Sequence, residues 1–179
     1  EYWSGQQRAN IEAARDAGVN LAFFAANDVY WKTRWEDNYR TLVSYKETWG
    51  DSGTAAKIDP NPAWTGTWRD PRFSPPSDGG RPENELIGTL FQVDSYRLDN
   101  MQVPAADGKM RFWRNTSIAS QSPGQVATLT PNVLGYEWNE DLDNGFRPAG
   151  AIRLSDTTLD VPAYLLDYGN TPGPGTATH

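Results

Sequence analysis

The amino-acid sequence predicts an α/β unit near the N-terminus, followed by a longer part that is rich in β-strands and turns. Three observations predict this fold class: a capped helix pattern over residues 4–17, a two-faced apolar run over residues 19–26, and short alternating apolar segments farther along. A chain of 179 residues is long enough for one domain with a buried core. We therefore treat it as a single domain with an α/β part (1–40), a β-rich part (41–166) and a flexible tail (167–179).

The first expected element is a helix over residues 4–17. Ser4 and Gln7 have the spacing of a capping box, in which the first side chain accepts a hydrogen bond from a backbone N–H of the first helical turn. Gly18 suits the left-handed conformation that often ends a helix. We expect one side of this helix to pack closely on a sheet, because alanines repeat along it: Ala9, Ala13 and Ala17.

A central strand of a parallel sheet is expected directly after the helix, over residues 19–26. After Asn20, both alternating faces of this run are apolar, as in strands that are buried on both sides. A helix, a glycine and such a strand make half of an α/β unit. Asn27 follows the carboxyl end of the predicted strand, where ligands bind in open α/β sheets. The other interpretation of Asn27 is a turn or a helix cap.

Further strands are expected after residue 40, where short apolar runs alternate with turn clusters. Before them, Trp31 and Trp35 lie four residues apart, which fits one stripe of a helix. Residues 50–78 form a long irregular stretch, and stretches of this length inside a domain are usually functional or mobile. The strand candidates are Arg40–Tyr45, Leu86–Val93, Met110–Trp113, Val126–Leu129, Val133–Trp138, Ile152–Leu154 and, more weakly, Tyr164–Leu166.

Composition and charge exclude several classes of function. The net charge of −7 argues against nucleic acid as the main partner. Cysteine is absent and the single histidine, His179, is the last residue, which excludes disulfides, thiolate zinc sites and an internal Ser-His-Asp triad within this chain. The longest apolar run is six residues, so we expect no membrane partner. Any metal would need oxygen ligands, which suit hard ions.

Two carboxylates are flanked by aromatic residues. Glu1 is followed by a tyrosine and a tryptophan, and Glu137 lies between another tyrosine and another tryptophan. A carboxylate in an aromatic wall has a raised pKa unless a cation or a hydrogen bond compensates. Such groups concentrate at functional sites. The alternative for Glu137 is an exposed position on an edge strand, with its aromatic neighbours facing the other side.

Seven segments, taken in order, form a specific combination: Glu1–Ser4, Ala13–Phe24, Asn27–Trp31, Thr65–Pro71, Pro82–Asn84, Phe112–Thr116 and Leu134–Trp138. In this combination the sequence resembles the C-terminal domain of the N,N-dimethylformamidase large (β) subunit family. The resemblance covers the chain from residue 1 to about residue 160.

The resemblance implies an α/β core of the glutamine-amidotransferase-like kind with β-rich insertions. It also implies hydrolysis of a small amide, dimethylformamide, to formate and dimethylamine, with a mononuclear iron held by two tyrosines and one glutamate. Glu1 matches that glutamate, while the two tyrosine ligands lie upstream of the matching segments. Asn27 matches the family's active-site asparagine, and Glu137 matches its active-site glutamate.

The resemblance further implies that this sequence is a piece of a larger bacterial protein. The family's His-Asp-Glu-Tyr-Trp motif is present only from Glu1 onward, and family members continue beyond His179 into another strand. We therefore expect the remainder of the parent chain to be a partner, and the isolated chain to hold no iron and to be inactive. The sequence does not decide between a cytoplasmic and a secreted soluble protein, and a homo-oligomer stays open.

Two functions from different classes follow. In the first, the domain is part of a metal-dependent amide hydrolase: Glu137 transfers a proton from the attacking water to the leaving amine, Asn27 binds the oxyanion or orients the water, and Glu1 holds the metal. The wall around the small amide would be aromatic, with Tyr2, Trp3, Tyr30, Tyr136 and Trp138 as candidates.

In the second, the domain is a non-catalytic carbohydrate-binding or interaction module, whose exposed aromatic rings stack on sugars. Convergence of Glu1, Asn27 and Glu137 on one cleft favours the enzyme. A planar row of exposed tryptophans favours the module.

Overall fold

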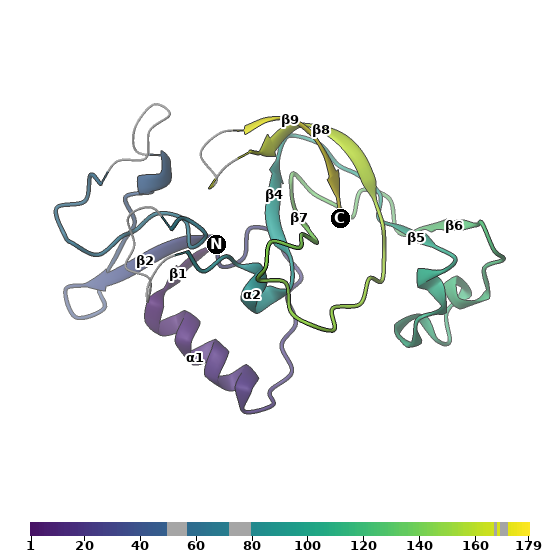
Figure 1. The fold of residues 1–179 in the computed structure, drawn as a ribbon, viewed down its shortest axis with the longest axis horizontal. Helices are drawn as coiled ribbons and strands as arrows, with labels where there is room; N and C mark the ends of the chain where they lie inside the picture. The colour runs from purple at the N-terminus through teal and green to yellow at the C-terminus, as the bar shows by residue number, and fades with distance from the viewer. Residues whose placement is uncertain (50–56, 72–79, 167, 169–171) are drawn as a thin grey trace.

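The structure is a computed structural model that describes residues 1–49, 57–71, 80–166, 168 and 172–179. Its described strands form a three-stranded sheet of order β1-β2-β3, a four-stranded sheet of order β7-β4-β8-β9 and a two-stranded β5-β6 pair (Figure 1). The elements are β1 (Tyr2–Ser4), α1 (Gly5–Asp16), β2 (Trp31–Glu36), β3 (Thr41–Val43), η1 (Glu47–Trp49), α2 (Asn84–Ile87), β4 (Leu90–Asp94), β5 (Gln102–Pro104), η2 (Asp107–Lys109), η3 (Arg111–Trp113), η4 (Ser117–Ser120), β6 (Val126–Thr128), β7 (Glu137–Glu140), β8 (Thr158–Leu165) and β9 (Pro172–Thr178).

The fold is mixed α/β with a high β content. Strand β1, helix α1 and strand β2 form a βαβ unit, because β1 and β2 pair in parallel with Tyr2 opposite Trp31. The four-stranded sheet is antiparallel throughout. A glutamine-amidotransferase-like core is not established by these sheets. Within the described ranges, no helix has the length and apolar character needed to cross a membrane.

Helix α1 begins and ends as its capping residues predict. The Oγ of Ser4 accepts a hydrogen bond from the backbone N–H of Gln7 at 3.2 Å. Gly18 has a φ of 89°, and the N–H groups of Gly18 and Val19 donate to the carbonyls of Arg15 and Ala14. This pair of bonds is the Schellman arrangement, which favours glycine at this position because a side chain would be strained there.

The inner face of α1 carries a buried arginine beside the apolar Ile11, which corrects the expectation of an alanine-lined contact. Arg8 is completely buried, whereas the three alanines of the predicted face are exposed. The guanidinium of Arg8 lies 4.8 Å from the ring centre of Trp68 and donates to Glu12 at 2.8 Å. A buried guanidinium with carboxylate, carbonyl and aromatic partners therefore occupies the inner face where alanines were expected.

The central strand predicted over residues 19–26 is wrong. The segment is an irregular connection, and Phe24 is 98% exposed. Its side chains Leu21 and Phe23 pack inward, in the cluster that includes Trp3 on β1. Ala26, at the end of the segment, packs against a second cluster, around Tyr30. The apolar pattern of a segment indicates which of its side chains can be buried. A strand also needs a neighbouring strand to pair with, and the strand that pairs in parallel with β1 is β2 rather than this segment.

The later strand predictions have mixed outcomes. Strands β3 and β6 lie inside predicted runs, while β4 and β7 overlap the C-terminal ends of theirs and extend beyond them. Residues 110–113 are not a strand but contain the 3₁₀ turn η3, and residues 152–154 lie in no strand. Trp31 and Trp35 belong to β2 rather than to a helix. Strand β8 extends the weak candidate at 164–166 toward the N-terminus.

The last residues form a strand where a flexible tail was expected. Strand β9 pairs antiparallel with β8. A Cβ placed on Gly175 would lie 2.8 Å from the Cβ of Tyr164, so glycine permits the close approach of the two strands. The expected tail and the long irregular stretch also include residues outside the described ranges: 50–56, 72–79, 167 and 169–171.

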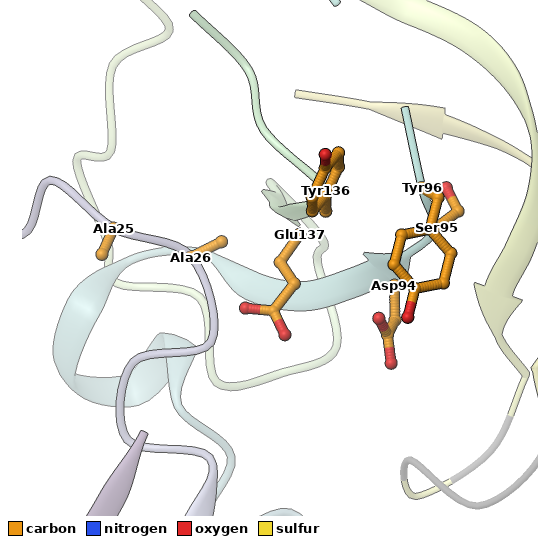
Figure 2. Close-up of a pocket in the computed structure, with 7 residues that line it drawn as sticks. All are labelled: Ala25, Ala26, Asp94, Ser95, Tyr96, Tyr136 and Glu137. Carbon is orange, nitrogen blue, oxygen red and sulfur yellow. The ribbon is translucent and has the colours of Figure 1, made fainter. Parts of the chain in front are cut away.

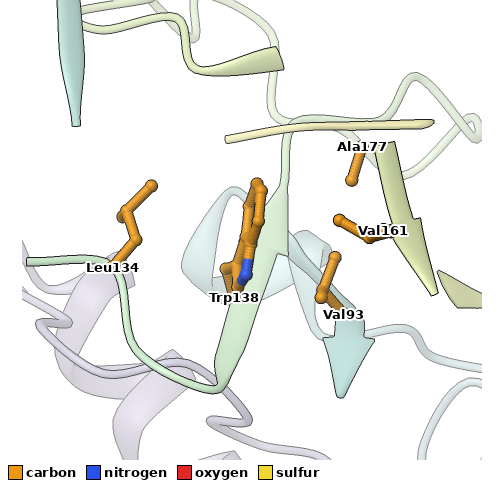
Figure 3. Packing of buried hydrophobic residues seen from close by; sticks show 5 residues of the cluster. All are labelled: Val93, Leu134, Trp138, Val161 and Ala177. Carbon is orange, nitrogen blue, oxygen red and sulfur yellow. The ribbon is translucent and has the colours of Figure 1, made fainter. Parts of the chain in front are cut away.

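The four-stranded sheet has an apolar core around Trp138, which is 1% exposed. Figure 3 shows this indole between the side chains that surround it from β4, β8, β9 and the segment before β7. The cluster consists of Val93, Leu134, Trp138, Val161 and Ala177. We call it the Trp138 cluster.

The region around β2 buries charged side chains in addition to apolar and aromatic ones. Glu47 is fully buried and accepts hydrogen bonds from the backbone N–H of Thr65 at 2.8 Å and from Lys57 Nζ at 3.0 Å. Arg69 and Glu83 form a buried ion pair. Residues 57–71, which the sequence places in an irregular stretch, thus supply an ordered polar network beside β2.

Candidate functional site

A cavity of about 300 Å³ brings together the three residues that the sequence singled out. Glu1, Asn27 and Glu137 all line it. Its other lining residues come from β2 and the turn before it, from the segment after β3, and from β4 and β8: Tyr30, Trp31, Lys46, Phe91, Asp94 and Leu165. We call it the central cavity, and both larger sheets contribute to it.

Asn27 is positioned by a tight turn just before β2. It has a φ of 60°, a left-handed conformation that asparagine tolerates better than most residues. Its backbone N–H donates to the Oδ1 of Asn139 at 3.3 Å, and only 6% of the residue is exposed. Asn27 therefore occupies a turn, as one interpretation proposed, and also lines the cavity.

The side chain of Asn27 holds the carboxylate of Glu137. Its Nδ2 donates to Oε1 of Glu137 at 3.1 Å. A carboxylate only accepts hydrogen bonds, so the amide nitrogen must face it. The Oδ1 of Asn27 is then left buried without a hydrogen-bond partner. One buried acceptor is therefore available for a donor from a ligand or a water.

Glu137 lies at an exposed position on an edge strand, in agreement with the alternative interpretation. It begins β7, the outer strand of the four-stranded sheet, and its neighbour Trp138 faces the apolar cluster. The aromatic flank on that side is therefore core. The carboxylate of Glu137 nevertheless contacts Asn27 and lines the central cavity.

The pKa of Glu137 is raised above its ordinary value of 4.5. Partial burial is the main cause, and the negative charges of Asp94 and Glu1 raise the pKa further. The hydrogen bond from Asn27 acts in the opposite direction, because it stabilises the carboxylate. A raised pKa agrees with the expectation from the sequence. Nearby negative charges contribute to the increase in addition to burial. A raised pKa makes a carboxylate a stronger base toward water.

A β-bulge in β4 brings Asp94 into the cavity. The register between β4 and β7 shifts between Phe91 and Val93. One extra residue reverses the alternation of side chains, so Phe91 and Asp94 both line the central cavity while Val93 faces the Trp138 cluster. Asp94 is paired directly opposite Glu137.

Lys46 supplies a positive charge to the central cavity. Its Nζ lies 4.8 Å from the ring centre of Trp31 and 5.1 Å from that of Tyr2. Both contacts have the geometry of cation–π interactions. Lys46 thus faces the same cavity as the carboxylates of Glu1, Asp94 and Glu137.

Sequence reasoning missed Lys46, Asp94 and Asn139. A signal existed for all three, because each directly follows the end of a predicted strand, as Asn27 was thought to do. The contact of Asn139 had no such signal, because its Oδ1 accepts from a residue 112 positions away in the sequence.

A second cavity, of about 450 Å³, shares Asp94 and Glu137 with the central cavity (Figure 2). Figure 2 shows both carboxylates pointing to the same side, with Tyr96 next to Asp94. The remaining lining residues are Ala25, Ala26, Ser95 and Tyr136. We call this space the tyrosine cavity.

The described residues do not form a metal site around Glu1. Within the described ranges, no group of three or more Asp, Glu, His and Cys side chains lies close enough to hold a metal ion. Glu1, Asp94 and Glu137 carry oxygen donors of the kind that hard cations prefer, but these donors do not surround one point. The residues present therefore do not by themselves fit a mononuclear iron.

Comparison with known proteins identifies one family. The model of the family described as N,N-dimethylformamidase beta subunit-like, C-terminal, matches residues 1–177. No curated protein matches the chain, and neither does any solved structure. The matched range contains every residue of the central cavity and of the tyrosine cavity.

Proposed function

The chain belongs to the N,N-dimethylformamidase beta subunit-like C-terminal family, and we propose that it is part of an amide hydrolase of the N,N-dimethylformamidase type. The observation that carries the proposal is the hydrogen bond between Asn27 and Glu137 in a cavity that Glu1 also lines. The substrate is a small amide, and dimethylformamide is the candidate that the family suggests.

Glu137 is the proposed proton-transfer group. As a carboxylate it takes a proton from a water molecule whose oxygen attacks the amide carbon. It then gives that proton to the amide nitrogen as the C–N bond breaks, so that a carboxylic acid and an amine are released. The raised pKa of Glu137 supports this role, since it brings the group closer to neutral pH.

Asn27 is the proposed positioning residue for both Glu137 and the water. Its Nδ2 fixes one oxygen of the carboxylate, and its buried Oδ1 has no partner within the described part of the chain. That oxygen can accept a hydrogen bond from the second O–H group of the attacking water, which would aim the water's lone pair at the substrate. Of the two roles considered for Asn27, water orientation thus has the better geometric support.

Iron remains part of the proposal only through the family resemblance. We propose Glu1 as the one ligand from this chain, with the others supplied by the remainder of the parent chain. No step above depends on the metal. We expect this chain alone to lose iron on dialysis and to hydrolyse no amide, because affinity falls with each missing ligand. Retention of stoichiometric iron in elemental analysis would overturn that expectation.

A carbohydrate-binding or interaction module is the second candidate. Its expected sign is a planar row of exposed tryptophans. Among tryptophan side chains in the described part of the structure, Trp35 is the one that is exposed, at 43%. The three residues singled out for catalysis share a cavity instead, which favours the hydrolase.

The proposal is tested by Glu137→Gln in the protein that carries this domain. Glutamine keeps the shape of the side chain and cannot take up the proton, so kcat for small N-alkyl amides should fall by roughly 10²–10⁴-fold with little change in Tm. The matched control is Glu36→Gln, a carboxylate on β2 outside both cavities. An unchanged kcat together with a lowered Tm would reduce Glu137 to a structural role.

A further inference from the structure

The tyrosine cavity holds two carboxylates without a cation. Asp94 and Glu137 are directly opposite each other on paired strands, an arrangement of like charges that destabilises a sheet. None of the residues that line this cavity is a lysine or an arginine. Within the described ranges, no hydrogen bond or ion pair engages the carboxylate of Asp94. A bound cation would therefore relieve the repulsion between these two carboxylates on the side of the tyrosine cavity, which has no lysine or arginine in its lining.

The aromatic side of the same cavity suits an organic cation. Tyr96 and Tyr136 lie with ring centres 5.5 Å apart in an edge-to-face arrangement, and they are 97% and 54% exposed. Exposed tyrosine faces beside carboxylates attract quaternary and alkyl ammonium groups through the ring quadrupole. Ala25 and Ala26 occupy the opposite side and leave the space open (Figure 2).

Buried acceptors without partners point to the same kind of ligand. Ser95 lines the tyrosine cavity, is 8% exposed, and its Oγ has no hydrogen-bond partner within the described ranges. Asn27, bonded to Glu137 at the shared wall, is 6% exposed and has an unpartnered Oδ1. Unsatisfied buried polar groups in a cavity wall need a partner, and N–H groups of an alkylammonium ion are suitable donors.

We propose that the tyrosine cavity binds an organic ammonium cation, with Asp94 as its counter-ion and the faces of Tyr96 and Tyr136 against its alkyl groups. This assignment does not require that the domain hydrolyse amides. If it does, the amine that leaves next to Glu137 takes up a proton at neutral pH and becomes such a cation.

The test is titration of this chain with trimethylammonium chloride at pH 7, where the amine is protonated, followed by NMR or calorimetry against a sodium chloride background. Saturable binding is expected, weakened at least about fivefold by Asp94→Asn and about 2- to 5-fold by Tyr136→Leu. Asp143→Asn, an exposed acidic residue outside both cavities, should leave binding unchanged. The uncharged analogue tert-butanol should bind far more weakly.

Three results would overturn the proposal: no saturable binding, equal binding by the Asp94→Asn variant with a native circular dichroism spectrum, or equal binding of tert-butanol. Because the readout is binding alone, its failure is distinct from a failure of the hydrolase proposal. A loss of kcat in Glu137→Gln could still be observed when trimethylammonium does not bind.

Discussion

The region around β2 and the four-stranded sheet are stabilised by different chemistry. Around β2, the fully buried side chains include charged groups, those of Arg8, Glu47 and Glu83, next to buried aromatic rings such as that of Trp68. In the four-stranded sheet, the buried centre is the indole of Trp138 among aliphatic groups. Buried charges require specific partners at specific distances, whereas apolar burial is non-directional.

This difference explains how the central cavity is built. The polar region supplies Asn27 and Lys46, each held by directional contacts. The apolar sheet supplies Asp94 and Glu137 from strand ends whose other face is anchored in the Trp138 cluster. The site lies where the two kinds of core meet.

The largest effect on stability is expected in the apolar core. Trp138→Ala removes a side chain that is 1% exposed and leaves a cavity, so the free energy of unfolding should fall by about 3–5 kcal/mol. Trp35→Ala, at a 43% exposed position on β2, is the matched control and should cost much less. Urea denaturation of both variants measures the difference, and equal costs would contradict the assignment of Trp138 to the core.

A smaller effect is expected in the polar region. Glu47→Gln keeps the volume of the side chain but removes the charge that the N–H of Thr65 and the ammonium of Lys57 contact. Hydrogen bonds to charged groups contribute about 1.5–3 kcal/mol, and the loss should be of that order. Glu36→Gln, whose partner Arg34 also bonds Asp59, serves as control. A cost for Glu47→Gln no larger than that of the control would show that the buried charges do not stabilise this region.

Almost no effect on the free energy of unfolding is expected at Phe24, in the segment 19–26 that was wrongly predicted to be a strand. Phe24→Ala should change the free energy of unfolding by no more than about 0.5 kcal/mol, since the side chain is 98% exposed. Phe23→Ala should cost more, because Phe23 packs beside Trp3. Denaturant titrations that show a cost of several kcal/mol for Phe24→Ala would restore the doubly buried strand.

The two regions should also respond to pH with opposite signs. Burial raises the pKa of Glu137, so its contribution to stability is present below about 4.5 and is lost as the pH rises through its raised pKa. The pKa of Glu12 is lowered. Burial alone would raise this pKa, but the hydrogen bonds from Arg8 and Arg81 outweigh the effect of burial. The stability that Glu12 provides is present above its ordinary pKa and is lost on acidification. The check is the Tm of the unaltered chain minus that of each variant, Glu137→Gln and Glu12→Gln, measured from pH 3 to 7. This difference should fall with rising pH for Glu137→Gln and rise for Glu12→Gln, and slopes of the same sign would refute the contrast.

The ends of a helix were predictable from the sequence, whereas contacts between residues far apart in the chain were not. The ends of α1 follow from Ser4 and Gly18, whose effects act within one turn of the chain. The run at 19–26 has the composition of a buried strand, but nothing in its pattern tells which backbone lies beside it. The buried charge of Arg8 is equally hidden, because its partners Arg81 and Glu85 lie more than 70 residues away.

The sequence predicted which residues belong to the site, but not how they come into contact. Asn27 and Glu137 were singled out from their neighbours in sequence and from the family resemblance, yet their contact spans 110 positions. Asp94 enters the cavity only because the bulge in β4 reverses the alternation of side chains, and no sequence period marks that extra residue.

The central claim is that Glu137 is a proton-transfer group whose protonation is controlled by Asn27 and Asp94, and it is tested most directly by NMR titration of the Glu137 side-chain carboxyl in this chain. The account predicts a pKa above the ordinary 4.5, lowered in Asp94→Asn and raised further in Asn27→Ala. A pKa at or below 4.5 in the unaltered chain, with no response to either substitution, would contradict it.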